Sequence, residues 1–66
     1  MKIFLNGEEA DARGAETIAD LVRVYQLPAQ TLLIEYNGAA LHQREWPDRP
    51  LRHGDKVEFV RIVAGG

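Results

Sequence analysis

The sequence contains no cysteine and no serine. The absence of cysteine excludes disulfides, zinc–thiolate sites, iron–sulfur clusters and thiol catalysis. Any sulfur chemistry would therefore have to use a group other than a side-chain thiol. The absence of serine excludes serine nucleophiles, and the hydroxyl of Thr17 is better explained as a helix cap.

Long apolar runs and a basic face are missing as well. The apolar runs fall far short of the roughly 20 residues that span a bilayer. Lys2 is followed by a strand pattern instead of the apolar segment of a signal peptide. The formal net charge is −2, which argues against a nucleic-acid partner. We therefore expect a cytoplasmic protein that binds neither membranes nor nucleic acid.

The chain has 66 residues, which predicts one domain near the lower size limit for independent folding. A chain of this length buries only about 60% of its unfolded surface, so it has no room for a deep active-site cavity. We expect a folded body over residues 1–63. Residues 64–66 should form a flexible end, because glycine has no Cβ and samples backbone conformations freely.

The N-terminal part predicts a β-hairpin. An apolar run over 2–6 ends in Asn6-Gly7, and Asn-Gly favours a type I′ turn because both central residues need a positive φ. A short polar strand over 9–13 should follow as a sheet edge, and Gly14 should end it.

A helix is predicted after this hairpin. Thr17 is the expected N-cap, and Asp20 resembles the acidic member of a capping box. Pro28 disfavours helical geometry at the residue before it, so the helix should end near Gln26. Apolar side chains recur at i, i+3, i+4 and i+7 on one face, which must lie on a sheet: Ile18, Leu21, Val22 and Tyr25.

The second half predicts further strands at 31–36, 39–41 and 56–63. The polar stretch between the last two, 42–50, should be a loop with one helical turn held by Trp46. A hairpin cannot close across the helix, so the strands that flank it should be parallel neighbours joined by a crossover. Alternation gives 31–36 two faces: Leu32, Ile34 and Tyr36 on one, Leu33 and Glu35 on the other.

Together these elements predict an α+β fold in which a mixed sheet of four to five strands packs on one main helix. Each core side chain contributes roughly 1.5–3 kcal/mol on burial, and chain entropy offsets most of that. The predicted core consists of Ile3, Leu5, Ile18, Leu21, Val22, Leu27, Ile34, Tyr36, Leu51, Val57 and Phe59.

No catalytic or metal-binding constellation is evident in the sequence. His42 and His53 have no second ligand at a metal-like spacing. Glu8, Glu9 and Asp11 fit the solvated face of an edge strand. The internal glycines occur singly at turns and form no phosphate loop. We therefore expect no metal, no bound cofactor and no enzymatic activity within the chain.

Two features remain as candidate functional sites. The first is the end of the chain, Val63-Ala64-Gly65-Gly66, which offers a carboxylate with no side chain beside it. The second is an outward-facing patch of the sheet. If the alternate residues of the first and last strands face the helix, then Phe4, Val60 and Ile62 point outward, where they would suit the docking of a partner.

The chain resembles the ubiquitin-like β-grasp fold in its element order and its terminal Gly-Gly. Within that fold it looks like the bacterial thiamin-biosynthesis sulfur carriers, the ThiS family. Members often carry Val-Pro-Arg where this chain has Leu41-His42-Gln43, with an arginine displaced to Arg44. The matching stretches span nearly the whole chain: Ile3-Phe4-Leu5-Asn6-Gly7, Thr17-Ile18-Ala19-Asp20-Leu21-Val22, Asn37-Gly38, Glu45-Trp46, Gly54-Asp55-Lys56-Val57-Glu58 and Val63-Ala64-Gly65-Gly66.

The resemblance implies a protein co-substrate. An E1-like adenylating enzyme of the ThiF type would use ATP to convert Gly66 to an acyl adenylate. Cysteine-derived sulfur would then displace AMP and leave a thiocarboxylate, which a thiazole synthase of the ThiG type would use to form the thiazole of thiamin. Ala64, Gly65 and Gly66 would thread the active sites of these partners, with Arg61 and Val63 near the mouth of each channel.

Three other interpretations stay open. The small subunit of molybdopterin synthase shares the fold, the tail and the thiocarboxylate chemistry, although it is usually longer. A ubiquitin-like protein modifier would join its tail to lysines of target proteins. A β-grasp interaction module would have a chemically inert tail. The mass of the chain after incubation with ATP, a sulfur donor and an activating enzyme would separate these classes.

Overall fold

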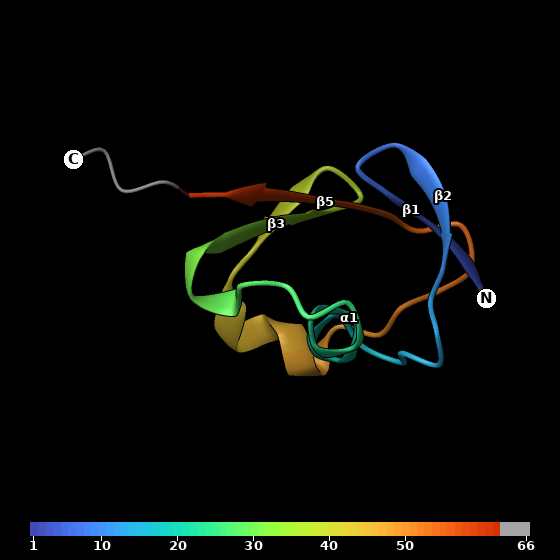
Figure 1. The fold of residues 1–66 in the computed structure, drawn as a ribbon, viewed down its shortest axis with the longest axis horizontal. Coiled ribbons are helices and arrows are strands. Elements are labelled where there is room, and N and C mark those ends of the chain that lie inside the picture. The colour runs from blue at the N-terminus through green and yellow to red at the C-terminus, as the bar shows by residue number, and fades with distance from the viewer. Residues whose placement is uncertain (63–66) are drawn as a thin grey trace.

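The computed structural model of the chain describes residues 1–62. Over this range the fold has two layers, a sheet and the helical segments that cover one of its faces (Figure 1). In chain order the elements are β1 (Lys2–Leu5), β2 (Glu8–Asp11), α1 (Ile18–Val24), the 3₁₀ helix η1 (Ala29–Thr31), β3 (Leu32–Tyr36), β4 (Ala39–Leu41), the 3₁₀ helix η2 (Gln43–Asp48) and β5 (Lys56–Arg61).

The sheet has five strands in the order β2-β1-β5-β3-β4. β1 and β2 form one antiparallel hairpin, and β3 and β4 form another. β5 joins the two hairpins, because it pairs parallel with β1 and antiparallel with β3. The predicted mixed sheet packed on one main helix is therefore confirmed. The last strand in the sequence is the central strand in space.

The prediction that the strands flanking the helix are neighbours is wrong. β2 and β3 run in the same direction, because each is antiparallel to one member of the parallel pair β1 and β5. However, β1 and β5 lie between them. β5 takes the central position because its Val57 is fully buried there, whereas the charged β2 is better placed at an edge. A rule that considers only consecutive elements takes no account of β5, which comes last in the chain but lies between β2 and β3 in the sheet.

Both predicted Asn-Gly turns are present. The φ angles are 50° at Asn6, 83° at Gly7, 49° at Asn37 and 87° at Gly38. These positive values are what a type I′ turn requires at both central positions. The two turns close the hairpins β1–β2 and β3–β4 and thereby bring each pair of strands into register.

The predicted second strand is displaced in the structure. β2 ends at Asp11, and Arg13 has a φ of 55° beside Gly14 at 83°, so these two residues form a turn. Ala12 and Ala15 on either side are buried. Neither alanine was predicted in the core. Both belong to the core cluster and lie in the segment that joins the sheet to the helix.

The ends of α1 follow from local hydrogen bonds. The hydroxyl of Thr17 accepts from the N–H of Asp20 at 3.1 Å, and the Asp20 carboxylate accepts from the N–H of Thr17 at 3.2 Å, so the predicted capping box is confirmed. At the other end, Gln26 has a φ of 53° and the N–H of Leu27 donates to the carbonyl of Val22 at 2.9 Å. This is the Schellman pattern, and it ends the helix where expected.

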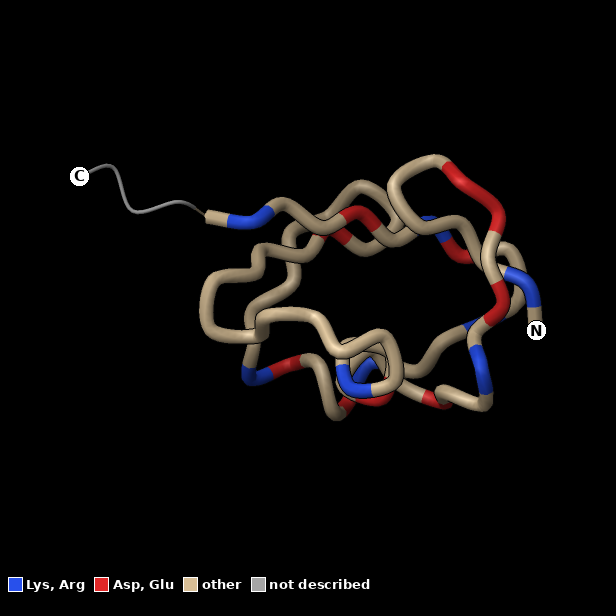
Figure 2. The backbone as a smooth tube through the Cα atoms, in the orientation of Figure 1, with Lys and Arg blue, Asp and Glu red and all other residues tan. Residues whose placement is uncertain are grey.

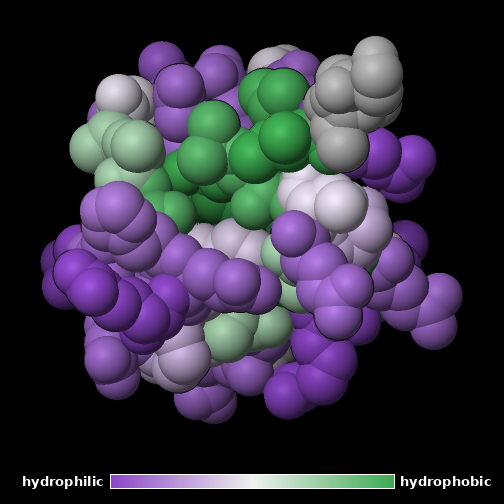
Figure 3. Space-filling view, turned by 90° about the vertical axis from the view of Figure 1, so that its left-hand side faces the viewer, coloured by the Kyte–Doolittle hydropathy of each residue, from purple (hydrophilic) through white to green (hydrophobic). Residues whose placement is uncertain are grey.

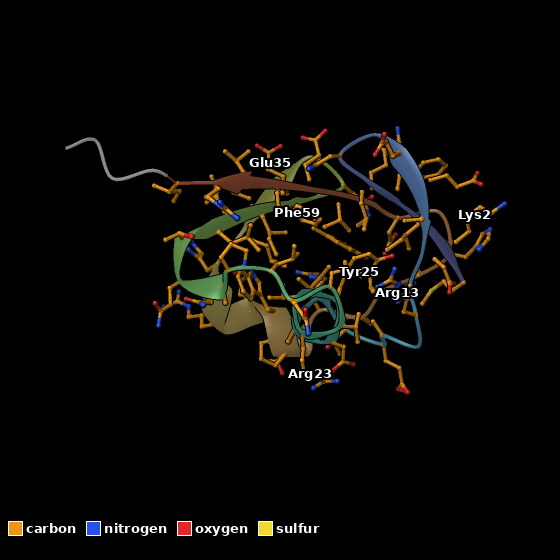
Figure 4. The ribbon with its side chains drawn as sticks, viewed as in Figure 1. Lys2, Arg13, Arg23, Tyr25, Glu35 and Phe59 are labelled. Atoms are coloured by element: carbon orange, nitrogen blue, oxygen red, sulfur yellow. The ribbon has the colours of Figure 1, made fainter. Side chains whose placement is uncertain are left out.

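The core lies between α1 and the sheet. Figure 4 shows Phe59 pointing from the sheet toward the helical layer. Three predicted core residues, Leu27, Tyr36 and Phe59, are partly buried and pack against the core instead of lying within it. Leu41 is a buried residue that sequence reasoning missed. The buried apolar residues are Ile3, Leu5, Ala12, Ala15, Ile18, Leu21, Val22, Ile34, Leu41, Trp46, Leu51 and Val57.

The polar stretch 42–50 is more ordered than expected. It forms η2 over Gln43–Asp48 instead of a single turn within a loop. Trp46 holds this segment as predicted, since its side chain is buried and its indole N–H donates to the carbonyl of Leu41 at 3.4 Å. None of the helices described has the length and apolar character needed to cross a bilayer.

Candidate functional site

β5 is the strand that leads toward the predicted site at the C-terminus. Gly66 itself, with Val63, Ala64 and Gly65, lies outside the described residues. β5 occupies the centre of the sheet and points away from the end of the molecule that holds the N-terminus (Figure 1). Whatever follows Ile62 is therefore attached to the middle of the fold and not to an edge strand.

β1 holds the first half of β5. Two residue pairs join them, Phe4 with Lys56 and Leu5 with Val57. β1 then ends at its turn, and the side chain of Asn6 continues the contact, because its Oδ1 accepts from the N–H of Phe59 at 2.8 Å. Asn6 thus both forms the turn and extends the pairing of β5.

β3 holds β5 along its whole length. Their pairing runs from Tyr36 opposite Val57 to Leu32 opposite Arg61. One further hydrogen bond follows, from the N–H of Ile62 to the carbonyl of Thr31 at 2.6 Å. The chain is therefore fixed by backbone hydrogen bonds up to the last residue that the structure describes.

A buried carboxylate fixes the start of β5. Asp55 is only 8% exposed. Its Oδ2 accepts from the hydroxyl of Tyr36 at 2.6 Å and from the N–H of Arg52 at 2.8 Å, and its Oδ1 accepts from the Asn37 side chain at 3.3 Å. Asn37 in turn accepts from the N–H of Lys56 at 2.8 Å. This network joins the β3–β4 turn to the first residue of β5.

The same network changes the chemistry of Tyr36. Burial raises the pKa of its hydroxyl above the usual value, and the hydrogen bond to Asp55 and the charge of Asp55 act in the same direction. Sequence reasoning missed this role of Asp55. Nothing local indicates it, because Tyr36 and Asn37 are 19 and 18 residues away along the chain.

Apolar side chains gather on the outer face of the sheet, the face turned away from α1. Val60 is 59% exposed, Ile62 54% and Leu33 43%. Leu33 lies directly opposite Val60 in the β3–β5 register, and Val60 and Ile62 lie on the same face, two residues apart. We name these three residues the exit patch. Figure 3, which looks at the end of the molecule toward which β5 points, shows a hydrophobic area there.

Phe4 lies on the outer face but away from the exit patch. It is half-buried and pairs with Lys56, which is four residues, or about 13 Å along a strand, before Val60. It lines a cavity of about 350 Å³ with Gly7, Lys56, Val57 and Glu58. The structure therefore places Val60 and Ile62 together, adds Leu33 to them, and sets Phe4 apart. Sequence reasoning left Leu33 out because alternation gives faces and not strand register.

The two histidines do not come together. His53 Nδ1 accepts from the backbone N–H of Lys2 at 3.2 Å, whereas His42 precedes η2. In the part of the chain that the structure describes, no three His, Asp or Glu side chains are grouped so that they could hold a metal ion.

Comparisons with known proteins give the family. A model of the ThiS family matches residues 3–66. The chain is 34% identical over 64 residues to the sulfur carrier protein ThiS of Thermus thermophilus, covering 97% of this chain and 98% of that one. It is 30% identical over 63 residues to an uncharacterized protein, ycf40, of Trieres chinensis, covering 96% and 86%.

The fold agrees with the sequence match. The crystal structure of ThiS from Geobacter metallireducens superposes with a TM-score of 0.85 at 28% identity, and the match covers 100% of both chains. That protein and this chain thus share the ubiquitin-like β-grasp arrangement described above. This chain is therefore a member of the ThiS family, the sulfur carriers of thiamin biosynthesis.

Proposed function

We propose that this chain carries sulfur as a thiocarboxylate on Gly66 and donates it to form the thiazole moiety of thiamin. The observation that carries the proposal is the family match, which extends through Gly66. The composition supports it, because a chain without cysteine cannot carry sulfur on a thiol. The carrier is a co-substrate, and the catalytic groups belong to its partners.

The carboxylate of Gly66 needs activation before it can take up sulfur. A terminal carboxyl group has a pKa of about 3.5 and is ionised at neutral pH, which makes it a poor electrophile. An E1-like adenylating enzyme of the ThiF type overcomes this with ATP. A carboxylate oxygen attacks the α-phosphorus, pyrophosphate leaves, and the product is an acyl adenylate.

Sulfur then replaces the adenylate. The sulfur of a hydrosulfide ion derived from cysteine attacks the acyl carbon of Gly66, the new C–S bond forms, the C–O bond to AMP breaks, and the S–H proton is lost to solvent. AMP leaves with the electron pair, and a thiocarboxylate remains. Glycine at 65 and 66 leaves the attacked carbonyl uncrowded because neither residue has a Cβ. A thiazole synthase of the ThiG type receives the sulfur.

The folded body serves to aim this end of the chain. The backbone of β5 is held up to Ile62 by β3. The exit patch lies next to that point and offers apolar surface to a partner. The exit patch forms the centre of the proposed docking surface, and Phe4 lies on the same face but apart from it, beside Lys56. Ala64, Gly65 and Gly66 thread the partner's active site.

The test is the intact mass of the chain after incubation with ATP, a cysteine-derived sulfur donor and the purified adenylating enzyme. We expect the exchange of one oxygen for sulfur at Gly66, and no exchange when ATP is omitted. Conjugates with lysines of other proteins would instead indicate a modifier. An unchanged mass in the complete mixture would contradict the proposal and leave an interaction module.

Deletion of Gly66 supplies the matched control. The truncated chain should unfold at the same denaturant concentration as the full chain, because the core lies within the described body. It should fail to support growth without thiamin in cells that lack their own copy. Growth of those cells on thiazole, but not on molybdenum cofactor, would assign the pathway. Growth of the truncated strain without any supplement would contradict the mechanism.

A further inference from the structure

The two Asn-Gly turns do more than reverse the chain, because the side chain of each asparagine holds a backbone N–H of β5. Asn6 Oδ1 accepts from the N–H of Phe59 at 2.8 Å. Asn37 Oδ1 accepts from the N–H of Lys56, also at 2.8 Å. Lys56 is the first residue of β5, whereas Phe59 lies in its second half. One asparagine therefore fixes the start of the central strand, and the other fixes it closer to its C-terminal end.

The side chain of Asn6 continues a ladder that the backbone of β1 can no longer supply. In the parallel β1–β5 ladder, the N–H of Phe4 donates to the carbonyl of Asp55 at 2.9 Å. The N–H of Asn6 then donates to the carbonyl of Val57 at 3.0 Å. In a regular parallel ladder the main-chain carbonyl of Asn6 would accept from Phe59 next, but the chain turns at Asn6, where φ is 50°. The side-chain carbonyl takes its place.

Beyond this hydrogen bond, β5 is supported on one side by β3. Over residues 1–62, the pairing of β1 with β5 ends at Leu5 opposite Val57, whereas β3 stays paired with β5 as far as Arg61. Figure 1 and Figure 2 both show the end of β5 continuing past the turn of the β1–β2 hairpin. With the Asn6 bond, β3 alone supports residues 60–62, and without that bond β3 alone would support 58–62.

The length of this one-sided segment affects the direction of the strand. A two-stranded ribbon twists more than the same strands do within a wider sheet. Loss of the Asn6 bond would therefore let the β3–β5 ribbon change its angle to β1. Phe4 lies on β1 and the exit patch lies on the ribbon, so the relation between these two parts of the outer face would change as well. The Asn6 side chain thus fixes how β5 leaves the body.

We propose that Asn6 is a positioning residue for the adenylation of Gly66, because it fixes the end of β5 relative to the rest of the docking surface. The inference rests on the proposed function. A carboxylate oxygen must meet the α-phosphorus of ATP in the correct geometry, and a misplacement of about 1 Å can slow a reaction about a hundredfold. Asn6 acts on this reaction only through the backbone of β5.

The test uses three full-length variants that all keep a residue suited to a positive φ. Asn6→Gly keeps the turn and removes the acceptor. Asn6→Asp keeps both the turn and an acceptor oxygen. Asn37→Gly is the matched control, because it removes the equivalent bond at the start of β5. Each chain is first shown to be folded by circular dichroism. The exchange of pyrophosphate into ATP by the purified adenylating enzyme, measured against chain concentration, then gives kcat and KM.

We expect Asn6→Gly to lower kcat about tenfold while KM changes by less than about twofold. A smaller folded fraction alone would instead raise the apparent KM and leave kcat unchanged, because more chain restores the competent carrier. Asn6→Asp should restore kcat. Asn37→Gly should keep the kcat of the unmodified chain, although its urea midpoint should fall at least as far as that of Asn6→Gly, since Asn37 also loses its bond to Asp55.

Three outcomes would overturn the inference: an unchanged kcat for Asn6→Gly, an equal fall in kcat for Asn37→Gly, or a kcat for Asn6→Asp as low as that for Asn6→Gly. The unmodified chain separates these from a failure of the proposed function. If it supports no exchange, the proposed function fails and the inference fails with it. If it supports exchange and Asn6→Gly keeps the same kcat, only the inference fails.

Discussion

The same strands form both faces of the sheet, but the side chains on the two faces have different roles. On β3, Ile34 faces the helix and is fully buried, while its neighbour Leu33 faces outward and is exposed. On β5, Val57 and Val60 differ in the same way. Burial on the inner face contributes roughly 1.5–3 kcal/mol per side chain. Apolar residues on the outer face contribute little to folding, so they remain available to a partner.

Acidic residues show the same contrast. Asp55 is buried, and its carboxylate accepts hydrogen bonds from Tyr36, Asn37 and Arg52. Glu35 and Glu58 face each other on the outer surface. The buried carboxylate thus accepts its hydrogen bonds within the fold, whereas the two outer carboxylates lie on the face of the sheet turned away from α1. Substitutions on the inner face should therefore change the free energy of unfolding, whereas substitutions on the outer face should change the affinity for a partner.

The largest expected effect comes from Ile34→Ala set against Leu33→Ala. Removing buried methyl groups leaves a cavity, so Ile34→Ala should lower the free energy of unfolding by about 2–5 kcal/mol. Leu33→Ala, one residue earlier on the opposite face, should change it by no more than about 0.5 kcal/mol. Urea denaturation measures both. Similar losses for the two variants would contradict the assignment of the faces.

Next in size is Asp55→Asn set against Glu58→Gln. The new amide N–H₂ at position 55 would meet donors from Tyr36 or Arg52, and a buried donor without an acceptor costs about 1–3 kcal/mol. Glu58→Gln should leave the free energy of unfolding unchanged or slightly higher. Loss of stability only in the Glu58 variant would reverse the roles that we give to these carboxylates.

A smaller effect is expected from pH. The pKa of Tyr36 is raised in the fold, chiefly by burial, so the folded state favours the neutral phenol. The stability that this provides is fully present below the unfolded pKa of about 10 and is lost as the pH rises through the higher folded value. The urea midpoint should therefore fall more steeply above about pH 10 in the unmodified chain than in Tyr36→Phe. Parallel curves would remove Tyr36 as the cause.

The smallest effect on stability should come from Val60→Ser. This exposed position should change the free energy of unfolding by no more than about 0.5 kcal/mol. Binding to the adenylating enzyme should nevertheless weaken, because the variant removes the centre of the exit patch. Calorimetry and urea denaturation on the same sample test both parts. A loss of folding stability without a loss of binding would show that Val60 belongs to the fold and not to the docking surface.

Local signals determined the elements of this protein. Thr17 and Asp20 set the start of α1 because a capping box needs only residues three apart. Asn6-Gly7 and Asn37-Gly38 set both hairpin turns because a positive φ is a property of the residues in the turn. Alternation along 31–36 correctly separated Ile34 from Leu33. The resemblance in the sequence was also sufficient to indicate the ThiS family, which the comparisons confirmed.

Only the tertiary structure decided how distant segments meet. It placed β5 between β1 and β3, brought Tyr36 and Asn37 to the carboxylate of Asp55, and set Leu33 opposite Val60 and Glu35 opposite Glu58. Strand register is a pairing between segments far apart in the chain, and no periodicity within one segment contains it. The free energy of burying the inner face selects that register. The register in turn determines which side chains lie next to each other on the outer face.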